Sequence, residues 1–110
     1  MKKLILNSQE ETLTKIVETA CDITREQIRS KFRYPKYVIP RMILGYLLRH
    51  EAGCTVDRAG KLIGRHHCSL IFYEAKFDEY NNSKFHPKFK EAYDKIMAEY
   101  ICSYPKIKEG

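Results

Sequence analysis

Apolar residues recur along this chain at the three- and four-residue intervals that place side chains on one face of an α-helix. The pattern predicts about six helices, over residues 9–21, 25–31, 40–53, 56–63, 66–80 and 87–103. No segment shows the sustained two-residue alternation that is typical of a half-buried strand. The chain is therefore expected to fold as an all-α protein.

Proline and glycine residues set the expected ends of several of these helices. Pro35 is expected to end the second helix within a break over 32–37, and Pro40 suits the first turn of the third helix. Gly53 is the expected C-terminal cap of that helix, and Gly64 separates the next two. The third helix carries a dense set of Ile and Leu residues, so it is expected to lie at the centre of the core.

The length of 110 residues suits one domain over 1–110, and its net charge of +6 is unevenly distributed. Residues 25–67 hold ten Lys or Arg against three Asp or Glu, and seven of the ten are Arg. Arginine makes planar, two-pronged contacts with phosphate and with guanine. The distribution predicts a face that binds a polyanion, and a merely solvated basic surface is the alternative interpretation.

The helices expected over 56–63 and 66–80 are short neighbours joined by a glycine-containing turn, which is typical of a helix-turn-helix. The second helix of such a pair presents its N-terminal turn to the major groove, so side chains there must be polar and short enough to reach base edges. In this chain that turn holds His66, His67, Cys68 and Ser69. The free N–H groups of a helix N-terminus also attract phosphate.

Several classes of function are not expected. No carboxylate pair or nucleophile–base set indicates an enzyme. Adjacent residues on a helix point about 100° apart, so His66, His67 and Cys68 are not expected to share a metal, and no cofactor is expected. The four cysteines lack a C-x-x-C pair, and no apolar run approaches the ~18–20 residues that span a membrane. A reduced, cytoplasmic protein is the expectation.

A more specific pattern covers residues 24–80. A basic loop reads Lys31-Phe32-Arg33, and Pro40-Arg41 then opens a helix. The two segments after it read Thr55-Val56-Asp57-Arg58-Ala59-Gly60 and Gly64-Arg65-His66-His67-Cys68-Ser69-Leu70. In order and spacing, these segments resemble the C-terminal, origin-box-binding domain of the bacterial replication initiator DnaA. The helix over about 87–103 would be an addition to that motif core.

The resemblance implies a role for each matching residue. Arg33 would enter the minor groove, and Asp57 stands where the family touches a base. The residues implied to hold phosphates are Lys31, Arg41, Arg49 and Arg65. Those implied to approach the DNA backbone are Thr55 and Val56. Those implied to face bases in the major groove are His66, His67, Cys68 and Ser69.

The chain departs from the family's pattern at three positions. His66 stands where the family has Asp, Cys68 where it has Ser or Thr, and Ala59 where it has Ile. A carboxylate accepts a hydrogen bond from cytosine, whereas an imidazole can donate one to guanine, so a different base preference is expected. The chain also lacks a G-x-x-x-x-G-K-[ST] motif, so nucleotide binding is not expected.

The expected function is sequence-specific binding of double-stranded DNA, related to recognition of a replication origin or to its regulation. Two alternatives stay open from the sequence. One is a helical transcriptional repressor similar to the tryptophan repressor, which would act as a homodimer on palindromic half-sites. The other is an adaptor whose basic face binds an acidic replication or transcription protein.

Overall fold

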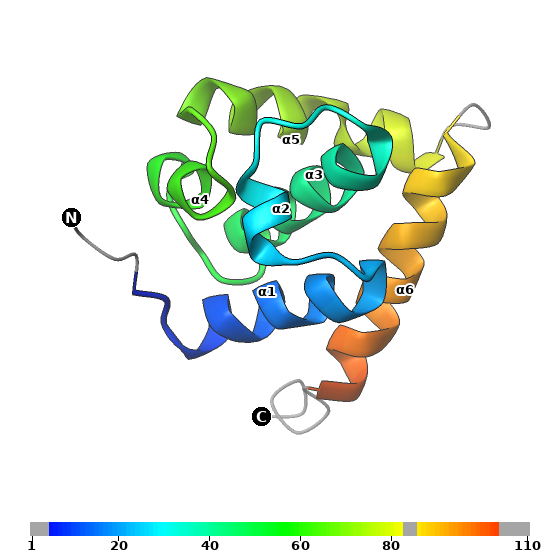
Figure 1. The fold of residues 1–110 in the computed structure, drawn as a ribbon, viewed down its shortest axis with the longest axis horizontal. Helices are drawn as coiled ribbons and strands as arrows, with labels where there is room; N and C mark the ends of the chain where they lie inside the picture. The colour runs from blue at the N-terminus through cyan, green and yellow to red at the C-terminus, as the bar shows by residue number, and fades with distance from the viewer. Residues whose placement is uncertain (1–4, 83–85, 104–110) are drawn as a thin grey trace.

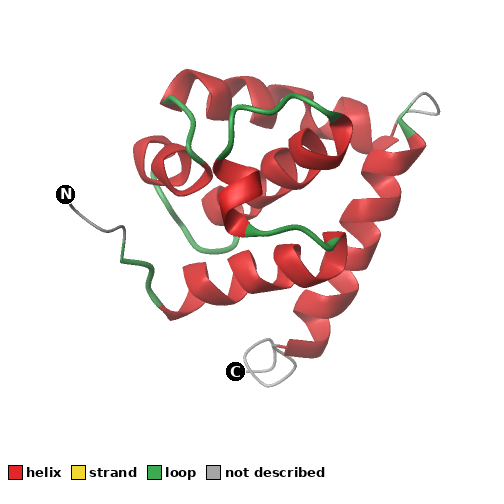
Figure 2. Ribbon diagram, in the orientation of Figure 1, coloured by secondary structure: helices red, strands yellow, loops and turns green. Residues whose placement is uncertain are grey.

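The structure is a computed structural model that describes residues 5–82 and 86–103. Within these ranges every regular element is a helix and there is no strand, which confirms the all-α class (Figure 2). The six helices are α1 (Ser8–Cys21), α2 (Arg25–Arg29), α3 (Pro35–His50), α4 (Val56–Ile63), α5 (His67–Asn82) and α6 (Pro87–Ser103). None of the helices described is long and apolar enough to cross a membrane.

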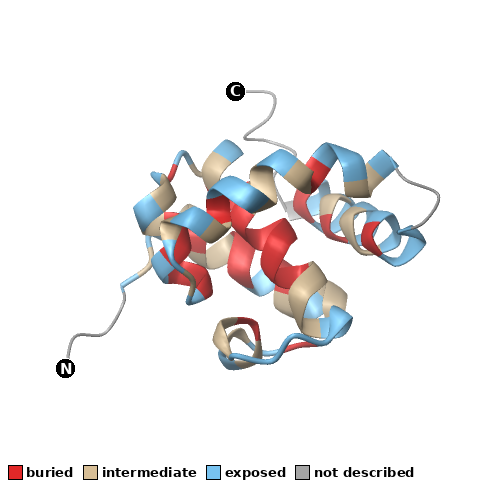
Figure 3. Cartoon of the chain, turned by 90° about the horizontal axis from the view of Figure 1, so that it is seen from above, coloured by how far each residue is buried: buried red, intermediate tan, exposed pale blue. Residues whose placement is uncertain are grey.

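Helix α3 is the centre of the fold. It contacts each of the other helices, with α1 and α6 along two edges of the molecule and α4 and α5 along the others (Figure 1). The side chains of Ile43, Leu44, Leu47 and Leu48 are almost completely buried, and buried residues gather on this central helix (Figure 3). All six helices contribute to one cluster of buried side chains, so the predicted central role of this helix is confirmed.

The N-terminal boundary of α3 differs from the prediction. The helix begins at Pro35, Pro40 lies inside it, and the break is confined to residues 30–34. Tyr34 is extended (φ −68°, ψ 145°) and its carbonyl accepts hydrogen bonds from the N–H groups of Tyr37 and Val38, at 2.8 and 2.9 Å. Pro35 therefore occupies the first helical position, where the missing N–H has no intrahelical partner to lose.

A buried carboxylate joins α1 to α4. Glu10 is 3% exposed, and its Oε1 lies 2.7 Å from Nη2 of Arg58. Its Oε2 accepts hydrogen bonds from Nε of Arg58 at 3.2 Å and from the thiol of Cys54 at 3.1 Å, while the backbone N–H of Asn7 donates to Oε1. The Arg58 guanidinium, opposed by burial, lowers the pKa of Glu10 to about 2. This contact fixes where α4 begins relative to the N-terminal helix.

Replacement of this carboxylate should weaken the fold in a pH-dependent way. We expect Glu10→Gln, which retains a capping oxygen, to lower the free energy of unfolding by about 2–3 kcal/mol at pH 7. Because the folded-state pKa is depressed from 4.5 to about 2, the contribution is complete above pH 4.5 and disappears as the pH falls toward 2. Urea unfolding at pH 7, 4 and 2 measures this, with the exposed Glu99→Gln as control; an equal loss at all three pH values would contradict it.

Candidate nucleic-acid interface

The joint between α4 and α5 is a tight turn over Gly64–His66. Gly64 ends α4 in the left-handed region (φ 71°, ψ 34°), and the N–H of Arg65 donates to the carbonyl of Gly60 at 2.8 Å. A Cβ on Gly64 would lie 2.8 Å from the carbonyl oxygen of Arg29 in α2, and one on Gly60 would lie 2.7 Å from that of Arg65. Side chains at either position would push the turn away from its neighbours, so the two glycines fix how α5 leaves α4.

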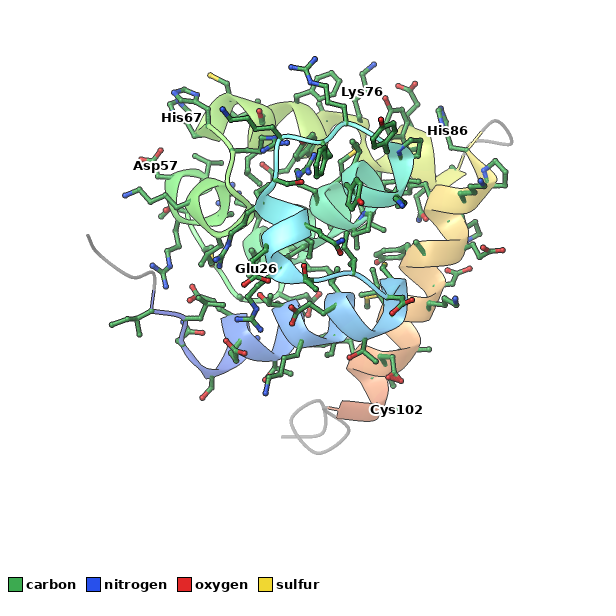
Figure 4. All side chains as sticks on the ribbon, viewed as in Figure 1. Glu26, Asp57, His67, Lys76, His86 and Cys102 are labelled. Carbon is green, nitrogen blue, oxygen red and sulfur yellow. The ribbon has the colours of Figure 1, made fainter. Side chains whose placement is uncertain are left out.

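The first turn of α5 gathers the residues that were predicted to face bases. His66 precedes the helix, and its Nδ1 accepts the N–H of Cys68 at 3.2 Å, so the imidazole caps α5. The His66 and His67 rings lie 4.1 Å apart, and Nδ1 of His67 lies 3.4 Å from Oδ1 of Asp57 in α4. Figure 4 shows His67 and Asp57 projecting at the same end of the helix pair. Cys68 is exposed, whereas Ser69 is partly covered.

The metal-ligand argument from sequence is wrong in its geometry. Donor atoms of His66, His67 and Cys68 lie within 4.8 Å of one another, because His66 stands before the helix rather than on it. However, Nδ1 of His66 already accepts a backbone N–H, and Nδ1 of His67 faces Asp57. The positive end of the α5 dipole also points at this group, which favours an anion over a cation.

The basic loop before α3 exposes alternating cations and aromatic rings. Lys31 and Arg33 are exposed, and Phe32 and Tyr34 are 53% and 64% exposed. The rings of Phe32, Tyr34 and Tyr37 pack against one another with centroids 5.4–6.4 Å apart. The loop is joined to the α4–α5 turn because Nη2 of Arg65 donates to the carbonyl of Ser30 at 2.8 Å. Part of the hydrogen-bonding capacity of the Arg65 guanidinium is therefore used within the protein.

Arg41 was predicted to hold a phosphate, but its side chain is turned into the protein. Its side chain is 1% exposed, and its guanidinium donates to the carbonyls of Ile28, Ser30 and Phe32 at 2.6, 3.0 and 3.1 Å. Burial lowers the pKa of this guanidinium from its ordinary value. The physical reason is the earlier start of α3, which moves Arg41 from an exposed first turn to the side of the helix that faces the loop.

The other residues that were predicted to contact the DNA backbone differ in their exposure to solvent. Nη1 of Arg49 donates to the carbonyl of Cys54 at 2.8 Å, and its Nε lies 3.4 Å from Glu74, so this arginine ties α3 to α5. Thr55 is exposed and caps α4 by accepting the N–H of Arg58 at 3.1 Å. Val56 is half-buried.

Most of the arginine excess serves the fold. Six of the seven arginines within residues 25–67 hydrogen bond to groups of the protein itself: Arg25, Arg29, Arg41, Arg49, Arg58 and Arg65. The exposed cations of this region are Lys31, Arg33, Lys36 and Lys61. The basic surface is therefore smaller than the charge distribution alone predicts, and it comprises the loop, the first turn of α3 and one residue of α4.

Sequence reasoning missed two residues on the exposed side of α5. Ile71 and Phe72 are 54% and 51% exposed, on the same helix as the predicted base-contacting residues. The sequence did carry a signal: Leu70 and Phe77 mark the buried face, so the positions directly after Leu70 must turn outward.

Comparison of the chain with protein-family models, with curated proteins and with solved structures finds no match. The likeness to DnaA therefore rests on the motifs quoted above.

The α4–α5 joint predicts an unusual response to a helix-favouring substitution. Alanine normally stabilises a helix interior by about 1 kcal/mol relative to glycine. At Gly60 the added Cβ would lie 2.7 Å from a backbone carbonyl, so we expect Gly60→Ala to destabilise the protein by about 1–3 kcal/mol. Urea unfolding followed by circular dichroism measures this. In Gly45→Ala the added Cβ meets only side-chain atoms, so this control should cost less; stabilisation by Gly60→Ala would contradict the role of the turn.

Proposed function

We propose that the chain binds double-stranded DNA sequence-specifically, with α4 and α5 acting as a helix-turn-helix. In this proposal the first turns of α5 enter the major groove and the loop over 30–34 reaches the adjacent minor groove. The observation that carries the proposal is the hydrogen bond from Arg65 to the carbonyl of Ser30, because it joins the exposed end of α5 to the basic loop. Two surfaces suited to two grooves are thus held at one spacing.

The charges on this face support the proposal. Lys31 and Arg33 are exposed on the loop, and Lys61 is exposed on α4. Cations in such positions neutralise phosphates flanking a groove, and an arginine inserted in a narrow minor groove is favoured by its negative potential. The arginines buried in the fold cannot supply these contacts, so the exposed Lys and Arg residues carry them.

The pairing of His67 with Asp57 suggests how a base could be read. When Nδ1 of a neutral imidazole donates to a carboxylate, Nε2 is left as a hydrogen-bond acceptor. An acceptor in the major groove matches the amino group of adenine or cytosine. Asp57 would therefore act by fixing the tautomer of His67, in addition to any contact of its own with DNA.

The biological process follows from the resemblance alone. The resemblance of residues 24–80 to the DnaA domain favours recognition of a replication origin, or regulation of that recognition. Binding that requires a stable homodimer and palindromic half-sites would instead indicate the repressor-like alternative.

Selection of duplexes from a random pool tests DNA binding and gives the target site. With the selected duplex, we expect affinity to fall steeply with salt, by about 0.9 log units per tenfold increase for each neutralised phosphate. Arg33→Ala should weaken binding and reduce the salt slope, whereas Lys95→Ala on α6, which removes the same charge, should not. His67→Ala should mainly relax discrimination between sites. No enrichment at low salt, or equal effects of Arg33→Ala and Lys95→Ala, would overturn the proposal.

The cysteines provide an independent footprint of the interface. Burial raises the pKa of Cys54 to about 12 and that of Cys21 to about 11, so both thiols should react slowly with iodoacetamide at pH 8. Cys68 on α5 and Cys102 on α6 are both exposed and should react rapidly. We expect the selected duplex to protect Cys68 at least tenfold and to leave Cys102 unprotected, measured by mass spectrometry. If the duplex changes the alkylation rate of Cys68 no more than that of Cys102, the DNA does not bind at the start of α5.

A further inference from the structure

Helix α5 carries apolar side chains on two opposite faces. Leu70 and Phe77 are 0% and 3% exposed and pack in the core. The opposite face carries Cys68, Ile71, Phe72 and Ala75, all of which are exposed. Large apolar side chains that stay in water on an otherwise well-packed helix mark a surface that another molecule covers.

These four exposed residues form one continuous stripe. They are spaced at i, i+3, i+4 and i+7, which places them in a row along a single helix face. The stripe begins at Cys68, directly beside His67, and extends toward the middle of α5. It therefore continues the surface to which the proposed base contacts belong.

The position of the stripe on α5 indicates what covers it. Lys76 borders the stripe one turn after Phe72, and its Nζ lies 3.3 Å from Oε1 of Glu79. Figure 4 shows His67 and Lys76 projecting outward along the same edge of the molecule. Among the carboxylates of α5, Glu74 is turned to Arg49 and His50, at 3.4 and 3.0 Å. The others, Asp78 and Glu79, lie in the C-terminal half of the helix. The stripe adjoins the histidines at the N-terminus of α5, where the helix dipole and free N–H groups favour an anion, so its position suits a polyanion that offers apolar groups inside a groove.

The major groove of DNA offers one such apolar group, the C5-methyl of thymine. We propose that Ile71 and Phe72 recognise thymine through contact with this methyl group and so determine part of the sequence specificity. The inference rests on the proposed function and adds two specificity-determining residues to it. Since an α-helix rises ~1.5 Å per residue, these side chains lie about 6–7 Å beyond His67 and Cys68. That distance corresponds to about two base-pair steps, which places the thymines inside the same half-site.

The test uses the full chain and the duplex enriched from a random pool, compared with the same duplex in which deoxyuridine replaces thymine. Deoxyuridine pairs like thymidine and lacks only the methyl group. We expect the wild-type protein to bind the deoxyuridine duplex more weakly, by a factor of about four per contacted methyl. Ile71→Ala and Phe72→Ala should weaken binding to the thymine duplex and abolish most of this difference. Ile101→Ala, which removes a similarly exposed side chain from α6, should change neither value.

The outcomes separate this inference from the function beneath it. A selected site without thymine, equal affinity for both duplexes, or a deoxyuridine effect that persists in both α5 variants would overturn the inference and leave DNA binding intact. Failure to enrich any duplex would overturn both. In that case, sedimentation of the wild type and of Phe72→Ala would show whether the stripe covers a second copy of the chain instead.

Discussion

Arg41 reaches from α3 into the loop that follows α2, and its guanidinium satisfies three backbone carbonyls of residues 28–32 in the interior. A buried charge is costly, and it is tolerated here because Nε and Nη2 of the guanidinium donate three hydrogen bonds. The same bonds give the irregular segment a single shape, since loop carbonyls left unpaired in the interior would each be unfavourable. The outward orientation of Lys31 and Arg33 depends on this internal anchor.

Other polar contacts extend the same principle across the candidate interface. Nε of Arg29 donates to the carbonyl of Leu62 and ties α2 to α4, and Glu10 ties α4 to α1 through Arg58. The two glycines of the α4–α5 joint allow backbones to approach where side chains would separate them. The apolar core holds the helices together, and this set of polar contacts determines how the short helices α2 and α4 are oriented relative to α5.

The positions of the helices could be predicted because amphipathic spacing reports burial directly. The residue at which α3 begins could not be predicted, because Pro35 and Pro40 suit a first helical turn equally well. Only tertiary contacts decide between them. That error of five residues is also what concealed the role of Arg41. The sequence also does not tell whether an arginine is exposed or paired within the protein. Arg25 and Arg58 count as surface charge in the sequence, although both are paired with carboxylates of α1. For Ile71 and Phe72 on α5, the helix period itself indicates the outward orientation, because both positions lie opposite the buried Leu70 and Phe77.

The carbonyl of Ser30 accepts hydrogen bonds from both Arg41 and Arg65, at 3.0 and 2.8 Å. One oxygen atom thus sets the separation between the loop and the start of α5, and neither element can adjust without breaking a bond. In the proposed complex, the fit between protein and duplex must then come from the DNA. The groove widths that it can adopt at low energy depend on base pairs that no side chain touches, so the stiffness of the target would contribute to its selection.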